Sequence, residues 1–152
     1  MEYSKKLQSF IDANTIRASV LIFSTSCHSV EEAAQSANAS VDEFVKNICT
    51  IDENGSLVVS IIAGKSKLDL KKVRSIVGSK VRFATGDEIL EKTGYPAGGT
   101  PSFGYCATFL VDPLVMEMNV VYSGGGSQNA LTKFDPKILI GLISPKVTDV
   151  VK

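Results

Sequence analysis

Apolar residues recur along the chain with two different spacings, and each spacing predicts its own kind of element. Leu7, Phe10 and Ile11 stand at helical spacing and predict a helix over residues 4–14. Spacing and capping residues predict further helices that start at Ser29, Ser40, Asp69, Asp87 and Asp135. Short apolar, β-branched runs predict strands at residues 18–24, 45–51, 57–62, 81–84, 106–111, 118–122 and about 147–151.

Turn-forming residues separate these segments. In the hairpin between the second and third runs, Asn54 and Gly55 are expected to supply the positive φ angles. At the start of the last helix, Asp135 is expected to cap and Pro136 to take the first helical position. Residues 94–104 are rich in glycine and proline, which predicts an irregular loop.

Helices and strands mix without strict alternation, which indicates an α/β fold. We expect one compact domain over residues 1–152, with a mixed, curved, barrel-like sheet and helices packed around it. A chain of 152 residues with 44% hydrophobic residues can bury a core of its own without disulfides or metals.

Composition also narrows the class of protein. No run of about 18 apolar residues occurs, so no membrane span is expected. The first residues lack the apolar stretch of a signal peptide, which favours the cytoplasm. The three cysteines have no Cys-x-x-Cys spacing, which argues against a disulfide framework or a thiolate zinc site.

Conventional catalytic groups are scarce. His28 is the one histidine, Gly-x-Ser-x-Gly is absent, and no carboxylate pair has a metal-binding spacing. On a strand, Cys27 and His28 would point to opposite faces. An enzyme with this sequence is therefore expected to work without a metal or cofactor, through positioning and backbone dipoles.

Two features suit such chemistry. The loop at 94–104 can turn several N–H groups toward one oxygen, although it can equally be an ordinary surface connection. Lys46 interrupts an apolar strand. An ammonium there either lines a wet pocket, finds a partner or lies on an exposed edge or face, because burying it alone is costly.

Positive charge is concentrated in one segment. Residues 64–82 carry seven Lys or Arg against one Asp, although the whole chain has 16 basic and 16 acidic residues. Such a segment can contact phosphates, or it can simply be the solvated face of a helix.

Six segments in order resemble the YbaK family, also called the prolyl-tRNA-synthetase-associated editing domain. They are Ser29–Ala34, Val45–Ile48, Ile61–Lys72, Gly94–Gly104, Leu110–Pro113 and Ser123–Gly126. The resemblance implies a barrel-like mixed sheet and a cytoplasmic deacylase. Family members hydrolyse the ester of mischarged aminoacyl-tRNA, typically prolyl tRNA that carries alanine or cysteine, as separate proteins or as a domain of the synthetase.

The resemblance also implies roles for individual residues. Lys46 corresponds to the family's essential lysine, near the terminal phosphate and the ester, and Asn47 matches members of the alanine-editing branch. The expected substrate-binding residues are Asn47, Gly98, Gly99, Thr100, Pro101, Gly104, Gly124 and Gly125. The expected tRNA-binding residues are Lys65, Lys67, Lys71 and Lys72. The implied mechanism is substrate-assisted: a ribose hydroxyl helps to activate water, or a substrate thiol attacks the ester.

Two departures from the family pattern keep other functions open. The family loop commonly reads Gly-x-x-x-Pro, but counting from Gly98 the fifth residue is Ser102 and proline comes one place early, at Pro101. Members with Lys-Asn often carry a histidine where this chain has glycines 124–126. A non-catalytic module that binds an aminoacyl-adenosine or a tRNA 3′ end is the alternative, and an interaction domain that docks a synthetase complex is a third hypothesis.

Overall fold

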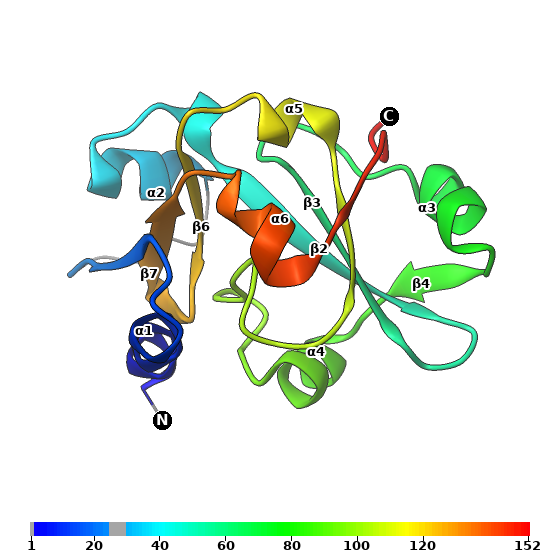
Figure 1. The fold of residues 1–152 in the computed structure, drawn as a ribbon, viewed down its shortest axis with the longest axis horizontal. Helices are drawn as coiled ribbons and strands as arrows, with labels where there is room; N and C mark the ends of the chain where they lie inside the picture. The colour runs from blue at the N-terminus through cyan, green and yellow to red at the C-terminus, as the bar shows by residue number, and fades with distance from the viewer. Residues whose placement is uncertain (1, 25–29) are drawn as a thin grey trace.

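Two β-sheets organise the residues that the computed structural model describes, namely residues 2–24 and 30–152 (Figure 1). The smaller sheet is antiparallel, in the order β1-β7-β6, and consists of β1 (Ala18–Ile22), β7 (Ser127–Phe134) and β6 (Val121–Gly125). The larger sheet has the order β4-β2-β3-β5-β8 and consists of β4 (Val81–Phe83), β2 (Val45–Asp52), β3 (Leu57–Ala63), β5 (Thr108–Val111) and β8 (Lys146–Val147). It is mixed, because β3, β5 and β8 run parallel while β2 is antiparallel to both of its neighbours.

Helices pack against both sheets. They are α1 (Tyr3–Ala13), α2 (Val30–Ala37), α3 (Leu70–Val77), α4 (Gly86–Thr93), α5 (Pro113–Met116) and α6 (Ile138–Ile143), with a single 3₁₀ turn η1 (Val41–Glu43). In Figure 1, α1 and α2 lie beside the smaller sheet, α3 lies at the far end of the larger sheet near β4, and α4 lies below the larger sheet. No helix in the described residues is long and apolar enough to cross a membrane.

Apolar side chains form three clusters. The largest contains residues of both sheets together with Leu7 of α1, Val115 of α5 and Leu139 of α6. On the opposite face of the larger sheet, α3 inserts Val73 against residues of β3, β4 and β5. The third cluster packs α2 onto β6 and β7. Because clusters lie on both of its faces, β3 is buried along its whole length.

The predicted α/β class with a mixed sheet is confirmed. The sheet does not close into a barrel, because the strands divide between two sheets. Local capping signals were accurate: Asp69 caps α3, Gly78 ends it in the left-handed conformation, and Ser40 forms a capping box with Glu43. The predicted box at Ser29 lies outside the described residues.

Several sequence predictions were wrong in detail. The hairpin after β2 has a positive φ only at Gly55 (79°), because the Asp52 carboxylate accepts from the N–H groups of Asn54 and Ser56 and closes the turn without it. The last helix begins at Ile138, and Asp135 instead accepts from the N–H of Lys137 in a preceding turn.

Elements in the second half of the chain differ most from the prediction. The long strand β7 and the short helix α5 were not predicted, β6 begins at Val121 and continues through the glycines to Gly125, and β5 begins at Thr108. The terminal strand is reduced to Lys146–Val147 and an isolated bridge between Leu68 and Val151. Polar residues open β7, so its signal is weak in the sequence; pairing with β1 and β6 stabilises it.

Candidate functional site

A cavity of about 400 Å³ opens where the two sheets meet. Its wall combines β2, β6, β7, the corner between β4 and α4, and the loop at 94–104. The described residues that line it are Ala33, Phe44, Val45, Lys46, Asn47, Ile48, Cys49, Phe83, Ala84, Ile89, Ala97, Gly98, Thr100, Tyr122, Ser123, Gly124, Ala130 and Leu131. Most are small or apolar, and polar groups come chiefly from β2 and the loop, which is typical of a small-ligand site.

Strand β2 supplies both residues of the Lys-Asn pair. β4 pairs with β2 only from Thr50 to Asp52, so no strand in the described residues pairs with the Lys46–Ile48 part of the β2 edge that borders the cavity. Because side chains alternate across a strand, Lys46 and Asn47 leave this edge on opposite faces of the sheet. The cavity therefore wraps around an open strand edge.

Lys46 has a partner and also lines the cavity. Its Nζ donates to the main-chain oxygen of Ser66 at 2.8 Å, and the side chain is half-buried. This contact anchors the ammonium to the loop before α3. Its two other N–H bonds have no partner among the described residues, so they are free to meet an anionic oxygen.

Asn47 joins a buried polar network. Its Nδ2 donates to the main-chain oxygen of Thr100 at 3.0 Å and to Ser123 Oγ at 2.8 Å. Its Oδ1 accepts from Ser102 Oγ at 2.8 Å, and the two serine oxygens are 2.6 Å apart. Ser102 and Ser123 are 0% and 1% exposed, so these bonds form out of contact with water.

Counting hydrogens fixes the direction of this network. Each serine has one hydroxyl hydrogen, and that of Ser102 is donated to Asn47. Ser123 must therefore donate to Ser102, which closes a ring of three bonds that runs from Asn47 to Ser123 to Ser102 and back. Both amide hydrogens of Asn47 are used within the protein. Its effect on a bound molecule is therefore to hold the loop in place through Thr100.

The loop at 94–104 packs closely against β6. The N–H of Gly126 donates to the oxygen of Gly99 at 2.7 Å. A Cβ on Gly99 would collide with the backbone of Gly126, and one on Gly124 would collide with the backbone of Thr100. Glycine is therefore required at these positions because two backbones approach each other closely.

Unpaired N–H groups of the loop lie at the cavity. Those of Gly98 and Thr100 are among several in the loop that have no acceptor within the described residues, whereas the N–H of Gly99 donates to the oxygen of Pro96. Gly98 and Thr100 both line the cavity, and Thr100 Oγ1 is held by the oxygen of Pro96 at 3.0 Å. Two unpaired N–H groups two residues apart can bind one oxygen that carries negative charge.

The other predicted loop residues have structural positions. Gly99, Pro101, Gly104 and Gly125 are not among the described residues that line the cavity. Gly104 has a φ of 102° and packs near Leu7. The oxygen of Pro101 accepts from the hydroxyl of Tyr105, and Gly125 packs against β7. Asn47, Gly98, Thr100 and Gly124 are thus brought together at the cavity.

Cys49 lines the same cavity from β2. Burial of its side chain raises the pKa of the thiol to about 11. The group therefore stays protonated at neutral pH and contributes an apolar wall rather than a nucleophile.

The lysines predicted to bind tRNA are not among the described residues that line the cavity. They are Lys65, Lys67, Lys71 and Lys72. Lys65 pairs with Asp42 at 2.7 Å, and Lys72 pairs with Asp149 at 2.7 Å and donates to the oxygen of Val151. The hydrogen bond to Asp149 raises the pKa of Lys72. Lys67 and Lys71 are exposed and have no ion pair among the described residues.

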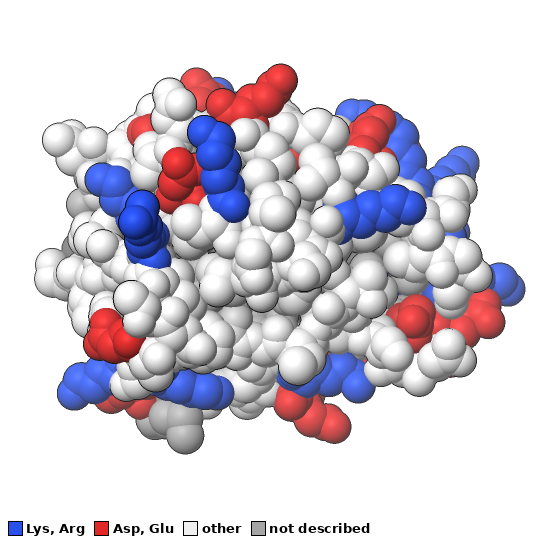
Figure 2. Space-filling view, in the orientation of Figure 1, with Lys and Arg blue, Asp and Glu red and all other residues white. Residues whose placement is uncertain are grey.

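Charges on the face seen in Figure 1 are interspersed. Figure 2 shows basic and acidic side chains next to one another near the rim of this face, around an uncharged centre. This face has no continuous basic patch in the part of the chain that the structure describes.

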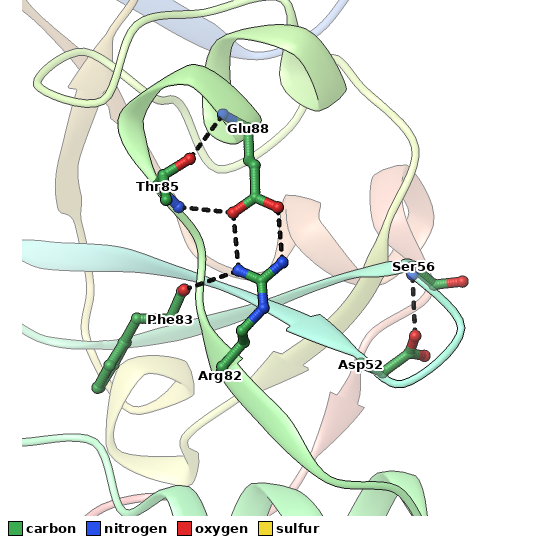
Figure 3. Close-up of polar contacts among 6 residues, drawn as sticks. All are labelled: Asp52, Ser56, Arg82, Phe83, Thr85 and Glu88. Atoms are coloured by element: carbon green, nitrogen blue, oxygen red, sulfur yellow. Dashed lines mark hydrogen bonds and ion pairs between the residues drawn. The ribbon is translucent and has the colours of Figure 1, made fainter.

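An ion pair fixes the corner between β4 and α4. Arg82 contacts both oxygens of Glu88, at 2.8 and 2.7 Å, and Glu88 completes a capping box with Thr85 (Figure 3). Arg82 also donates to the oxygen of Phe83. The bonds from Arg82 and Thr85 lower the pKa of Glu88 to about 2. This corner carries Phe83, Ala84 and Ile89 into the cavity wall.

Sequence reasoning missed Ser102 and Ser123 as site residues. In the sequence, Ser102 stood out only because it replaces the proline of the family loop. The structure gives this serine a role, since its hydroxyl donates to Asn47 and a proline side chain could not. His28 and Cys27 lie outside the described residues. No three His, Cys, Asp or Glu residues among the described ones cluster in a way that could hold a metal ion.

Known proteins of one family resemble this chain. Residues 24–142 match the family model of the aminoacyl-tRNA editing domain. The chain is 32% identical to the uncharacterised protein YwhH of Bacillus subtilis over 119 residues, which are 77% of this chain and 76% of that protein. Over 79 residues it is 33% identical to a proline–tRNA ligase of Pseudothermotoga lettingae, covering 51% of this chain but only 14% of the ligase.

A solved structure extends the match to the whole fold. A candidate trans-editing enzyme for prolyl-tRNA synthetase superimposes with a TM-score of 0.92 at 28% identity, over 100% of this chain and 98% of that one. The family match covers Lys46, Asn47, the loop at 94–104 and Gly124, all of which contribute to the cavity. The chain belongs to the aminoacyl-tRNA editing domain family.

Proposed function

We propose that this protein is a trans-editing hydrolase that deacylates mischarged tRNA, most simply prolyl tRNA that carries alanine or cysteine. The observation that carries the proposal is the meeting of Lys46 with the unpaired N–H groups of Gly98 and Thr100 at one cavity. Family membership supports editing as the general activity, and the geometry supports the hydrolytic step.

The ester carbonyl is placed against the loop. As water attacks the carbonyl carbon, the C=O electron pair moves onto oxygen, and the N–H groups of Gly98 and Thr100 stabilise the resulting oxyanion. Donors fixed in advance are effective because they need no reorganisation during the reaction, and removing one such donor typically costs about 10²–10³ in rate. Collapse of the intermediate expels the ribose oxygen and releases the amino acid.

Proton transfer in this mechanism uses the substrate. The neighbouring ribose hydroxyl accepts a proton from the attacking water and returns one to the leaving ribose oxygen. With a cysteinyl ester, the substrate thiol attacks in place of water, its proton passes to the leaving ribose oxygen, and the acyl group departs as a cyclic thiolactone. Lys46 stabilises the anionic phosphate and ester end with its free N–H bonds. No metal ion or cofactor enters these steps.

The cavity wall suits an acyl group whose side chain carries no charge. Ala84, Ala97 and Cys49 contribute apolar surface, and the thiol of Cys49 is neutral. Prolyl-tRNA synthetase is the partner that the comparisons suggest, since one relative is a proline–tRNA ligase and one neighbour is a candidate trans-editing enzyme for that synthetase. Lys67 and Lys71 are exposed and unpaired by acidic groups among the described residues, so they are the members of the basic segment best able to contact acceptor-stem phosphates.

Single-turnover deacylation of a small panel tests the proposal. The substrates are Ala-, Cys-, Ser- and Pro-tRNA of the proline isoacceptor, and Ala-tRNA of the alanine isoacceptor. Wild-type protein should hydrolyse one mischarged species rapidly, and Lys46→Ala should reduce that rate at least about 100-fold, as expected for the loss of a charged contact at the developing anion. Lys137→Ala, an exposed lysine on the turn before α6, is the matched control and should retain the wild-type rate.

Two outcomes would contradict the proposal. Full activity of Lys46→Ala would remove this residue from the mechanism. If no ester were lost while tRNA still bound in a salt-dependent manner, the chain would act as a binding module instead.

A further inference from the structure

We propose that Phe83 is a base-stacking residue at the mouth of the cavity, and that its ring receives the terminal adenine of the aminoacyl-tRNA. This inference rests on the proposed function and adds a binding residue for the nucleoside part of the substrate.

Phe83 is an exposed aromatic residue at the cavity. The residue is 56% exposed although it lines the cavity. It belongs to none of the apolar clusters, and it makes no ring contact with another aromatic side chain, in the described parts of the chain. An aromatic face left open at the rim of a cavity offers a surface on which a planar base can stack.

Register places Phe83 on the same sheet face as Lys46. Phe83 pairs directly with Thr50 across the β2–β4 ladder, so their side chains share one face. Lys46, Ile48 and Thr50 alternate along β2 and therefore lie on that face as well. Since residues on a strand rise about 3.3 Å each, the Cα atoms of Lys46 and Thr50 are about 13 Å apart. A nucleoside with an ester on its ribose has a similar length, so its two ends can reach Lys46 and Phe83 together.

The position of Phe83 is fixed in advance. Its main-chain oxygen accepts from Arg82, which is held by both oxygens of Glu88, and the N–H of the next residue, Ala84, donates to the oxygen of Cys49 at 3.0 Å. Figure 3 shows the Arg82 fork between β4 and the first turn of α4. The ring therefore projects from an anchored corner, which limits the conformational entropy lost when a base binds.

Stacking also suits the chemistry of this substrate. A stacked base needs no specific hydrogen bonds, and every tRNA presents adenine at its 3′ end, so a sequence-tolerant aromatic contact is sufficient. Ile48 lies on the same face between Lys46 and Phe83 and extends the apolar surface along the ribose.

The test compares two non-hydrolysable ligands by direct binding. One is 3′-alanylamino-3′-deoxyadenosine, and the other is the same alanylamino ribose without a base. Wild-type protein should bind the adenosine compound more tightly. Phe83→Ala should weaken its binding by about 5- to 100-fold, leave binding of the abasic compound unchanged, and lower kcat/KM for mischarged tRNA by a similar factor. Phe83→Tyr should restore binding, whereas Phe83→Leu, which stays apolar, should not.

Controls separate this inference from the proposed function. Ile140→Ala removes another exposed apolar side chain, on α6, and should change neither binding nor rate. If wild-type protein deacylates mischarged tRNA but Phe83→Ala binds the adenosine compound normally, the stacking inference is overturned and the proposed function stands. If wild-type protein deacylates nothing, the proposed function fails, and the two binding measurements still decide whether Phe83 holds the base.

Discussion

Removing the Ser102 hydroxyl tests whether the ring of Asn47, Ser123 and Ser102 acts as a unit. Ser102→Ala deletes two hydrogen bonds, one to Asn47 Oδ1 at 2.8 Å and one from Ser123 at 2.6 Å. Each such bond contributes about 0.5–1.5 kcal/mol net, so the free energy of unfolding should fall by about 1–3 kcal/mol. Ser123→Ala also breaks two bonds of the ring and should cost a similar amount.

The free energy of unfolding of the double variant, with both Ser102→Ala and Ser123→Ala, decides whether the two serines act together. The bond between the two serines is lost in each single variant but only once in the double variant. The two single costs should therefore exceed the double cost by one bond, about 1 kcal/mol, in a double-mutant cycle measured by equilibrium urea unfolding. Costs that add to within about 0.5 kcal/mol would refute the ring, since independent sites behave in that way.

Ser60→Ala is the matched control for this experiment. Ser60 is also 0% exposed, but its hydroxyl has no hydrogen-bond partner within the described residues. Its removal should leave the free energy of unfolding unchanged or raise it, because an unpaired buried hydroxyl is itself unfavourable.

Two further predictions concern the loop and the ion pair. Gly124→Ala should lower the deacylation rate at least about 10-fold, because its Cβ would displace the backbone of Thr100. Gly141→Ala is the control and should leave the rate unchanged, because open space surrounds that position. An unchanged rate for Gly124→Ala would show that the contact with Thr100 does not matter. Arg82 holds the pKa of Glu88 at about 2, below its ordinary value of 4.5. In equilibrium unfolding, the difference in free energy of unfolding between wild type and Glu88→Gln should therefore be fully present above pH 4.5. It should disappear as the pH falls from about 4.5 to 2. A difference that stays constant over this range would rule out the pair as its source.

Much of the fold was predictable because its signals are local. Asp69 and Gly78 mark the two ends of α3 with the cap and the left-handed residue that a helix needs, and both were placed correctly. The β2–β3 hairpin follows from two apolar runs around a short turn. The turn itself was misjudged at Asn54, since the Asp52 carboxylate binds the backbone there and only Gly55 needs a positive φ.

The sequence by itself determined the class of fold, the family and the scarcity of conventional catalytic groups. These depend on periodicity, on capping residues and on motifs read in order, all of which act over a few residues. Strand β7 was not predicted, because it begins with polar residues and is stabilised by pairing with β1, more than 100 residues earlier in the chain. In that case tertiary pairing overrides weak local propensity.

Tertiary structure alone decided how the site is built. Asn47 meets Ser102 and Ser123 across 55 and 76 residues of sequence, and no local rule connects such distant positions. The same holds for the contact of Lys46 with Ser66 and for the open rim position of Phe83, which depends on where β4 leaves β2. Hydrogen-bond partners and exposure are properties of packed neighbours, so they become defined only when the two sheets and the glycine loop come together.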